Sequence, residues 1–125
     1  MNIPSHLKYT KSDEWFDPST GAVGISDFAQ SQLSDIVFVE LLVEEGEEVS
    51  AGKAIASVES VKASAEIYSP VAGKVSAVNK GLSDKPETLN SDPFGEGWMI
   101  KIEGGSAGDM MDSAVYEKDC EGRAH

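Results

Sequence analysis

The chain has 125 residues and a formal net charge of −12, from 22 acidic and 10 basic side chains. This length is typical of one domain with a single core, and we expect residues 1–125 to form one domain. The acidic balance argues against a nucleic acid or an anionic membrane surface as partner. No run of about 18 apolar residues is present, so the sequence predicts no transmembrane helix. The first six residues lack the apolar segment of a signal peptide, and we therefore expect no export.

Acidic residues are concentrated in the first half of the chain. Between Lys11 and Lys53 there are ten acidic residues and no lysine or arginine. Two interpretations are open at this point. The acidic half is either a solvated face that resists aggregation, or a source of electrostatic attraction for partners with basic surfaces.

Short apolar runs separated by turn residues predict a mostly β fold. The segment 36–43 is rich in β-branched and apolar side chains and is predicted to be a largely buried strand. Further strands are predicted at 54–58, 65–68, 74–78 and 98–102. Many short strands with closely spaced turn signals are typical of a sandwich or a barrel.

Two segments are predicted to be helical. Ser26 is placed to cap a short helix over residues 27–33. Near the C-terminus an apolar stripe with helical spacing, which we expect to pack on the sheet, comprises Met110, Met111, Ala114 and Val115. The polar residues 118–125 are predicted to form a loose tail, so that the core of the domain spans about 7–117.

Two similar strand units frame a lysine at the centre of the chain. Residues 51–58 and 72–78 both begin with Ala-Gly-Lys and continue with small and apolar side chains. The polar segment 59–64 between them is predicted to be a reverse turn that joins the strands on either side. If these strands pair, Lys62 lies near the tip of a hairpin. By itself, an exposed turn lysine is most often only a solvated charge.

The residue patterns of common enzymes do not occur in the sequence. Cys120 is the sole cysteine, and with two histidines it cannot supply a Cys/His zinc site. His6 and His125, near the two ends, are poor candidates for a general base. No Gly-x-Ser-x-Gly elbow, Walker A loop or dinucleotide-binding glycine pattern is present. We expect a protein that is not an enzyme and binds no metal, so any chemistry must come from an attached group.

Several blocks of sequence agree, in order, with one known family. The main similarity lies in Glu59-Ser60-Val61-Lys62-Ala63 and in Glu66-Ile67-Tyr68-Ser69-Pro70-Val71-Ala72-Gly73-Lys74-Val75. Further blocks lie at 8–11, 14–15, 23–26, 35–41, 92–93 and 97–98. Over roughly residues 7–117 the chain resembles the glycine cleavage system H protein family.

The resemblance implies a lipoyl carrier, with lipoic acid joined to Lys62 by an amide. In that family a glycine decarboxylase transfers an aminomethyl group to the lipoyl group, and an aminomethyltransferase delivers it to tetrahydrofolate. A dihydrolipoyl dehydrogenase then reoxidises the carrier. These three enzymes and the lipoate-attaching enzymes are the expected partners of a monomeric carrier. The expected location is the cytoplasm in a bacterium, or the matrix of a mitochondrion or related organelle for a mature eukaryotic form.

The resemblance also implies a fold and a set of site residues. The fold is a lipoyl-type barrel-sandwich hybrid of two antiparallel sheets, with short helices that include one at the C-terminus. Ser12, Glu14 and Glu66 match the positions at which the family docks the loaded arm. Glu59 would be a cue for the lipoylating enzyme. Gly73 would either permit a tight turn that a Cβ atom obstructs or be an ordinary hairpin glycine.

Three features depart from the family pattern, and none involves Lys62. Asp13 stands where the family usually has a histidine before Glu-Trp, and Glu66 stands where aspartate is common. The acidic connection at 41–46 is one residue longer than the family's usual loop. These departures concern the resting contacts of the arm and the shape of the acidic loop.

Two other functions are left open by the sequence. The same modification would suit a lipoyl relay or lipoate-storage protein that does not meet glycine decarboxylase, and the fold would suit an unmodified binding domain. The blocks at 14–15 and 97–98 favour the glycine-cleavage carrier, because a minimal lipoyl domain does not need them. Biotin carriers share the architecture, but methionines typically flank their lysine, and here Val61 and Ala63 do.

Overall fold

Two antiparallel sheets form the body of the protein. The computed structural model describes residues 2–105, 108 and 110–123. The larger sheet has the order β1–β2–β3–β9–β8–β5, formed by Lys8–Tyr9, Glu14–Phe16, Ala22–Ile25, Ile100–Glu103, Gly73–Val78 and Glu48–Val49. The smaller sheet has the order β4–β6–β7, formed by Ile36–Leu41, Ala54–Ser60 and Ser64–Tyr68. The mostly β, two-sheet fold expected from the sequence is confirmed.

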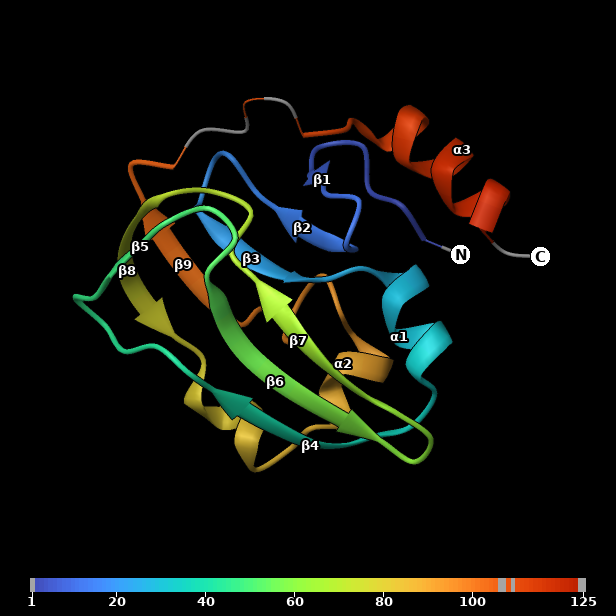
Figure 1. Cartoon of the computed structure of the whole chain (residues 1–125), viewed down its shortest axis with the longest axis horizontal. Coiled ribbons are helices and arrows are strands. Elements are labelled where there is room, and N and C mark those ends of the chain that lie inside the picture. The colour runs from blue at the N-terminus through green and yellow to red at the C-terminus, as the bar shows by residue number, and fades with distance from the viewer. Residues whose placement is uncertain (1, 106–107, 109, 124–125) are drawn as a thin grey trace.

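Short helices lie at the margins of the sheets, as Figure 1 shows. They are α1 (Asp27–Leu33), the 3₁₀ turn η1 (Lys80–Ser83), α2 (Thr88–Ser91) and the C-terminal α3 (Ser113–Arg123). Among the described residues, none of the helices combines the length and the apolar character needed to cross a bilayer. In Figure 1, α3 lies beside β1 and the N-terminal segment, far from the tip of the β6–β7 hairpin.

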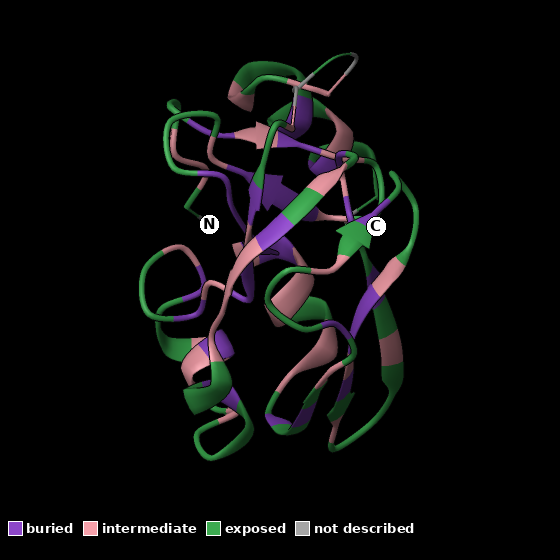
Figure 2. Cartoon of the chain, turned by 90° about the vertical axis from the view of Figure 1, so that its left-hand side faces the viewer, coloured by how far each residue is buried: buried purple, intermediate pink, exposed green. Residues whose placement is uncertain are grey.

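The main core lies between the two sheets, and both sheets contribute buried residues to it, purple in Figure 2. A second apolar cluster joins the first strands to α1 and α3, and its buried members include Tyr9, Trp15, Phe28, Tyr116 and Cys120. The rings of Tyr9 and Tyr116 are stacked, with centroids 4.5 Å apart and planes inclined by 3°. This cluster therefore attaches the C-terminal helix to the N-terminal part of the larger sheet.

The predicted N-cap of α1 is confirmed. Ser26 has an extended backbone, and its hydroxyl oxygen accepts the Ala29 N–H at 3.1 Å. This bond satisfies one of the amide groups that a helix leaves unpaired in its first turn. Asp27 follows in that first turn, where a carboxylate is favoured by the helix dipole.

The first predicted strand is less buried than expected. Strand β4 ends at Leu41, and Val37 and Phe38 are 55% and 47% exposed. The strand covers the core with only one face, through Ile36 and Val39. The other face of β4 belongs to the outer, solvent-exposed face of the smaller sheet. The apolar run at 36–43 is therefore buried on one face of the strand only.

The C-terminal predictions are wrong in two respects. Helix α3 begins at Ser113, and Met111 instead lies in a β-bridge with Tyr9, so the methionine stripe is not on the helix. The buried residues of α3 are Tyr116 and Cys120. The helix also continues through Arg123, where the sequence predicted a loose tail from 118; residues 124–125 lie outside the described part. The spacing of apolar residues within the segment could not indicate the extent of α3, because α3 is held by residues about a hundred positions away, such as Asp13.

Candidate functional site

The predicted hairpin around Lys62 forms, and the lysine lies at its tip. Strands β6 and β7 pair up to Glu59 and Ser64. The Ser60 N–H donates to the Ala63 carbonyl at 2.7 Å, which closes the turn. The Ser60 hydroxyl oxygen also accepts the N–H groups of Ala63 at 3.1 Å and Lys62 at 3.3 Å. Ser60 thus supplies hydrogen-bond partners for the backbone of the turn. The exposed Lys62 side chain takes no part in these bonds.

Contacts to the rest of the protein hold this tip in place. The Val61 N–H donates to the Asp35 carbonyl at 3.0 Å, although 67% of Val61 is exposed. The side chain of Asn90 holds both neighbours of Asp35. Its Oδ1 accepts the Ile36 N–H at 2.9 Å, and its Nδ2 donates to the Ser34 carbonyl at 2.8 Å. A protruding turn is therefore supported from α2 and from the start of β4.

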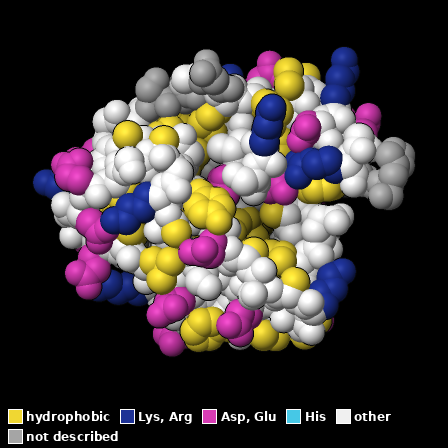
Figure 3. Space-filling view, viewed as in Figure 1, with side chains coloured by type: hydrophobic (Ala, Val, Ile, Leu, Met, Phe, Trp, Pro, Cys, Tyr) yellow, Lys and Arg dark blue, Asp and Glu magenta, His cyan; other side chains and the backbone are white. Residues whose placement is uncertain are grey.

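The outer face of the smaller sheet, which we call the small-sheet face, carries carboxylates and apolar side chains together. Phe38 is opposite Glu59, and Ser57 lies between Glu40 and Glu66 across the three strands. Tyr68 continues the outward row of β7. Figure 3 shows magenta and yellow side chains interspersed over this part of the surface. Lys62 thus projects from the end of an acidic and partly apolar face.

A buried carboxylate lies at the start of β2. Glu14 is 1% exposed. Its Oε1 accepts the hydroxyl groups of Thr10 and Ser12, both at 2.6 Å, and its Oε2 accepts the Tyr68 N–H at 3.3 Å. The bond to Tyr68 links the larger sheet to β7, the strand that leaves the Lys62 turn. We call Glu14 with Thr10, Ser12 and the Tyr68 amide the carboxylate site.

The predicted docking residues are only partly brought together. Ser12 and Glu14 are in direct contact, as the sequence suggested. Glu66 lies exposed on the small-sheet face, two residues before Tyr68, and no hydrogen bond or ion pair joins it to Glu14 among the described residues. Thr10 and the Tyr68 amide were not among the predicted site residues. The alternation Thr10-x-Ser12-x-Glu14 was a usable signal for the first; a backbone donor leaves no signal in side-chain identity.

The environment of Glu14 acts on its pKa in two directions. Burial raises the pKa above the usual value for a glutamate, because the charged form loses hydration. The hydrogen bonds from Ser12, Thr10 and the Tyr68 amide oppose this rise, and the nearby Asp13 adds to it. The balance favours a raised pKa. This carboxyl group therefore changes charge at a higher pH than an exposed glutamate.

Asp13, the departure noted before Glu-Trp, has an unusual conformation and several partners. Its φ is +74°, in the left-handed region that L-residues other than glycine rarely adopt. Its carboxylate accepts the Tyr116 hydroxyl at 2.9 Å and two N–H groups of Arg123 at 2.5 and 3.1 Å. The residue between Ser12 and Glu14 is therefore tied to the C-terminal helix.

Comparison with known proteins decides the family. A family model described as "Glycine cleavage H-protein" matches residues 7–122. The chain belongs to that family. The glycine cleavage system H protein of Deinococcus deserti is 49% identical over 118 residues, covering 94% of this chain and 97% of that protein. The one from Nocardia farcinica is 46% identical over 124 residues, covering 91% and 93%.

A solved structure of the same family supports the fold. The crystal structure of a glycine cleavage system H protein from Mycobacterium marinum is similar with a TM-score of 0.85 and 35% sequence identity, covering 93% of this chain and 97% of that chain. The resemblance stated from the sequence is thus confirmed. As an H-protein family member, the chain is a carrier component of the glycine cleavage system.

The two residues predicted to help lipoylation lie in different sheets. Glu59 is exposed on β6, three residues before Lys62. Gly73 begins β8 in the larger sheet, opposite Val49. A Cβ atom at Gly73 would collide with the Glu103 carbonyl oxygen of the adjacent strand. Close approach of β9 therefore accounts for this glycine, and its part in lipoylation stays a prediction, as does that of Glu59.

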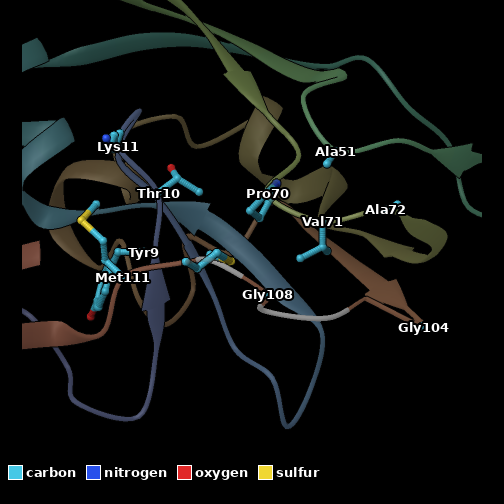
Figure 4. Close-up of a pocket in the computed structure, with 11 residues that line it drawn as sticks. Tyr9, Thr10, Lys11, Ala51, Pro70, Val71, Ala72, Gly104, Gly108 and Met111 are labelled. Atoms are coloured by element: carbon cyan, nitrogen blue, oxygen red, sulfur yellow. The ribbon is translucent and has the colours of Figure 1, made fainter. Parts of the chain in front are cut away.

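A cavity of about 640 Å³ lies elsewhere on this H-protein family member. Figure 4 shows residues from two sides of it: Tyr9, Thr10 and Met111, and Pro70, Val71 and Ala72. Neither Lys62 nor Glu66 lines it. Strand β7 (Ser64–Tyr68) runs between Lys62 and Pro70, and its five residues alone span about 13 Å. The cavity is therefore separate from the hairpin tip, and only Thr10 belongs both to its lining and to the carboxylate site.

The raised pKa of Glu14 predicts a pH-dependent loss of stability. Between the ordinary pKa and the raised pKa, the folded protein holds a proton that the unfolded chain has released, so the free energy of unfolding falls as pH rises through this window. Glu14→Gln removes this titration, and its free energy of unfolding should fall less steeply. Denaturant unfolding at a series of pH values measures both slopes. Glu66→Gln, on an exposed side chain, is the control that should follow the wild type; a Glu14→Gln slope equal to the wild-type slope contradicts the assignment.

Proposed function

We propose that this H-protein family member carries lipoic acid as an amide on Lys62. The observation that carries the proposal is an exposed lysine side chain at the tip of a hairpin whose turn bonds are made by Ser60 and Asp35. The residues present fit an attached acyl group, because acylation of the lysine Nζ disturbs no described hydrogen bond of the turn. The dithiolane of a bound lipoyl group supplies the means to accept and pass on an aminomethyl group derived from glycine.

In this proposal the chain presents the lipoyl arm and carries its cargo between enzymes, and it does not itself catalyse a reaction. A braced hairpin tip holds the attachment point away from the body of the protein, so a flexible arm can enter the active sites of larger enzymes. Tethering raises the effective concentration of the carried group at each site. We propose glycine decarboxylase, the aminomethyltransferase, dihydrolipoyl dehydrogenase and a lipoate-attaching enzyme as the partners, with a monomeric carrier in the cytoplasm or an organelle matrix.

Replacing Lys62 should abolish carrier function without unfolding the protein. Lys62→Arg keeps the charge at an exposed tip, where substitutions usually change the free energy of unfolding by less than about 0.5 kcal/mol. The variant should melt at the wild-type temperature, and intact-mass measurement after incubation with a lipoate-attaching enzyme should show no added lipoyl group. Lys53→Arg, at a lysine outside the turn, is the matched control and should be modified normally. A lipoyl group on Lys62→Arg would disprove the assignment.

We further propose that the loaded arm docks at the carboxylate site. The amino group of the cargo is expected to be cationic, and a charge-assisted hydrogen bond to a carboxylate is among the stronger kinds. Glu14 offers such an acceptor, with the Ser12 hydroxyl on one carboxylate oxygen and the Tyr68 N–H of β7 on the other. Glu66, on β7 four residues beyond Lys62, extends the acidic surface toward the turn.

Loss of the Glu14 carboxylate should make the cargo less well protected. The carried aminomethyl group can be lost to water as formaldehyde and ammonia, so docking should slow this loss. Glu14→Ala should release formaldehyde several-fold faster than wild type when both are loaded and held without the transferase. Glu121→Ala, on the exposed side of α3, should match wild type. Equal release rates for Glu14→Ala and wild type would remove Glu14 from the docking site.

The small-sheet face is proposed as the surface that meets basic partner enzymes. Its carboxylates Glu40, Glu59 and Glu66 surround apolar side chains close to the attachment point, a combination that suits a basic partner with apolar contacts. The Michaelis constant of each partner enzyme for the carrier should therefore rise with ionic strength, because screening shortens to about 8 Å at 0.15 M salt.

Removing a single carboxylate charge from the small-sheet face should measurably raise the Michaelis constant for the carrier. Glu40→Gln should raise the Michaelis constant about two- to fivefold at low salt, which is typical of one exposed ion pair. Glu121→Gln removes the same charge from α3, outside the small-sheet face, and should have little effect. If neither ionic strength nor Glu40→Gln changes the Michaelis constant, the face is solvated and not a docking surface.

A further inference from the structure

The guanidinium group of Arg123 joins three elements that are remote in sequence. It donates to the Asp13 carboxylate in the turn between β1 and β2. It also pairs with Asp119, one turn earlier on α3, at 2.9 Å. The guanidinium carbon Cζ of Arg123 lies 4.9 Å from the ring centroid of Phe28 on α1, which is a cation–π distance. The last described turn of α3 is therefore fastened to α1 and to the turn that holds Ser12.

The Tyr116 hydroxyl makes a second link from α3 to the same carboxylate. It donates to Asp13 Oδ1 at 2.9 Å and lies 2.6 Å from the Ser26 hydroxyl. Since the tyrosine proton is directed to Asp13, Ser26 donates to Tyr116 while its oxygen caps α1 through the Ala29 N–H. The hydrogen bonds thus run in one direction, from the start of α1 through Tyr116 to Asp13. Such chains polarise one another and resist partial opening.

The backbone of Asp13 is held as firmly as its side chain. The Asp13 N–H donates to the Thr10 carbonyl at 3.2 Å, and the Asp13 carbonyl accepts the Ser26 N–H at 2.9 Å. These bonds fix the left-handed turn, at a φ that a residue with a Cβ atom adopts only when its surroundings require it. Ser12 and Glu14 leave this turn on either side with their oxygens 2.6 Å apart.

We propose that Arg123 and Tyr116 are positioning residues for the carboxylate site and act through Asp13. By holding Asp13 in its left-handed conformation, the C-terminal helix keeps the Ser12 hydroxyl on Glu14. Any effect of α3 on protection of the cargo rests on the proposed docking of the loaded arm at Glu14. The geometric coupling between α3 and Glu14 does not depend on that docking.

The first test uses the unmodified protein and follows the Glu14 carboxyl carbon by NMR as pH is changed. In Arg123→Ala the turn can relax and the Ser12 bond is lost while Glu14 stays buried. Since that bond favours the charged form, the titration midpoint of Glu14 should rise by about half a pH unit or more. Asp119→Asn is the matched control: it removes the other carboxylate on Arg123 without touching the turn, and it should leave the midpoint at the wild-type value.

A double-mutant cycle separates positioning through Asp13 from a direct effect of the arginine charge. In the Asp13→Gly background, Arg123→Ala should cause no further shift of the Glu14 midpoint. A direct electrostatic effect would persist in that background and would overturn the proposal. Tyr116→Phe keeps the ring stacked on Tyr9 and removes only the hydroxyl, so it tests the second link even if Arg123→Ala loosens α3. It too should raise the midpoint.

The second test measures formaldehyde release from loaded protein. Arg123→Ala and Tyr116→Phe should release the cargo at least about threefold faster than wild type, whereas Asp119→Asn should match wild type. If wild type cannot be loaded, or if Glu14→Ala does not release faster, the proposed function fails. If Glu14→Ala releases faster and the two α3 variants do not, only the positioning role fails. Variants of α3 that lower the melting temperature but leave both the midpoint and the release rate unchanged would show a purely structural helix.

Discussion

The packing of a three-stranded sheet against a six-stranded sheet is the constraint on which the rest of this structure depends. The smaller sheet buries one face through residues such as Val39, Val58 and Ile67 and leaves the other to solvent. With both strands of its hairpin anchored in this way, the β6–β7 turn projects while remaining rigid at its base. The attachment proposed for Lys62 needs this combination of exposure and fixed position, and Ser60 and Asp35 supply the hydrogen bonds that a free loop would lack. Among the described residues no second layer covers the outward face, so its carboxylates remain exposed to water.

The carboxylate site depends on the meeting of the two sheets. Glu14 stands on the larger sheet, and the Tyr68 N–H that it accepts belongs to the smaller one. Burial of a carboxyl group is unfavourable unless its oxygens are hydrogen-bonded, and three donors satisfy them here. The carboxylate is therefore part of the contact between sheets as well as an acceptor that faces β7. If the loaded arm docks as proposed, this arrangement also gives the carried cationic group an acceptor on the larger sheet.

Asp13 illustrates how a departure from a family pattern can be accommodated by distant residues. A carboxylate beside Glu14 would by itself make the charged form of Glu14 less favourable, and this is one of the effects that raise the pKa of Glu14. The Arg123 guanidinium and the Tyr116 hydroxyl compensate by binding that carboxylate. The C-terminal helix is consequently longer than its polar sequence suggested, and it is joined to the N-terminal turn by charge as well as by the stacked rings of Tyr9 and Tyr116.

The sequence by itself determined the features that depend on near neighbours. The cap at Ser26, the turn around Lys62 and the β character of the chain follow from local residue preferences, and the ordered blocks were sufficient to identify the family. Tertiary structure decided which faces are covered and which distant groups meet. It left Val37 and Phe38 exposed, ended α3 at Arg123 rather than near Tyr116, and brought the Tyr68 amide to Glu14 without Glu66. The physical reason is that burial, and hydrogen bonds between residues 50 to 110 positions apart, arise only when the two sheets and α3 pack together.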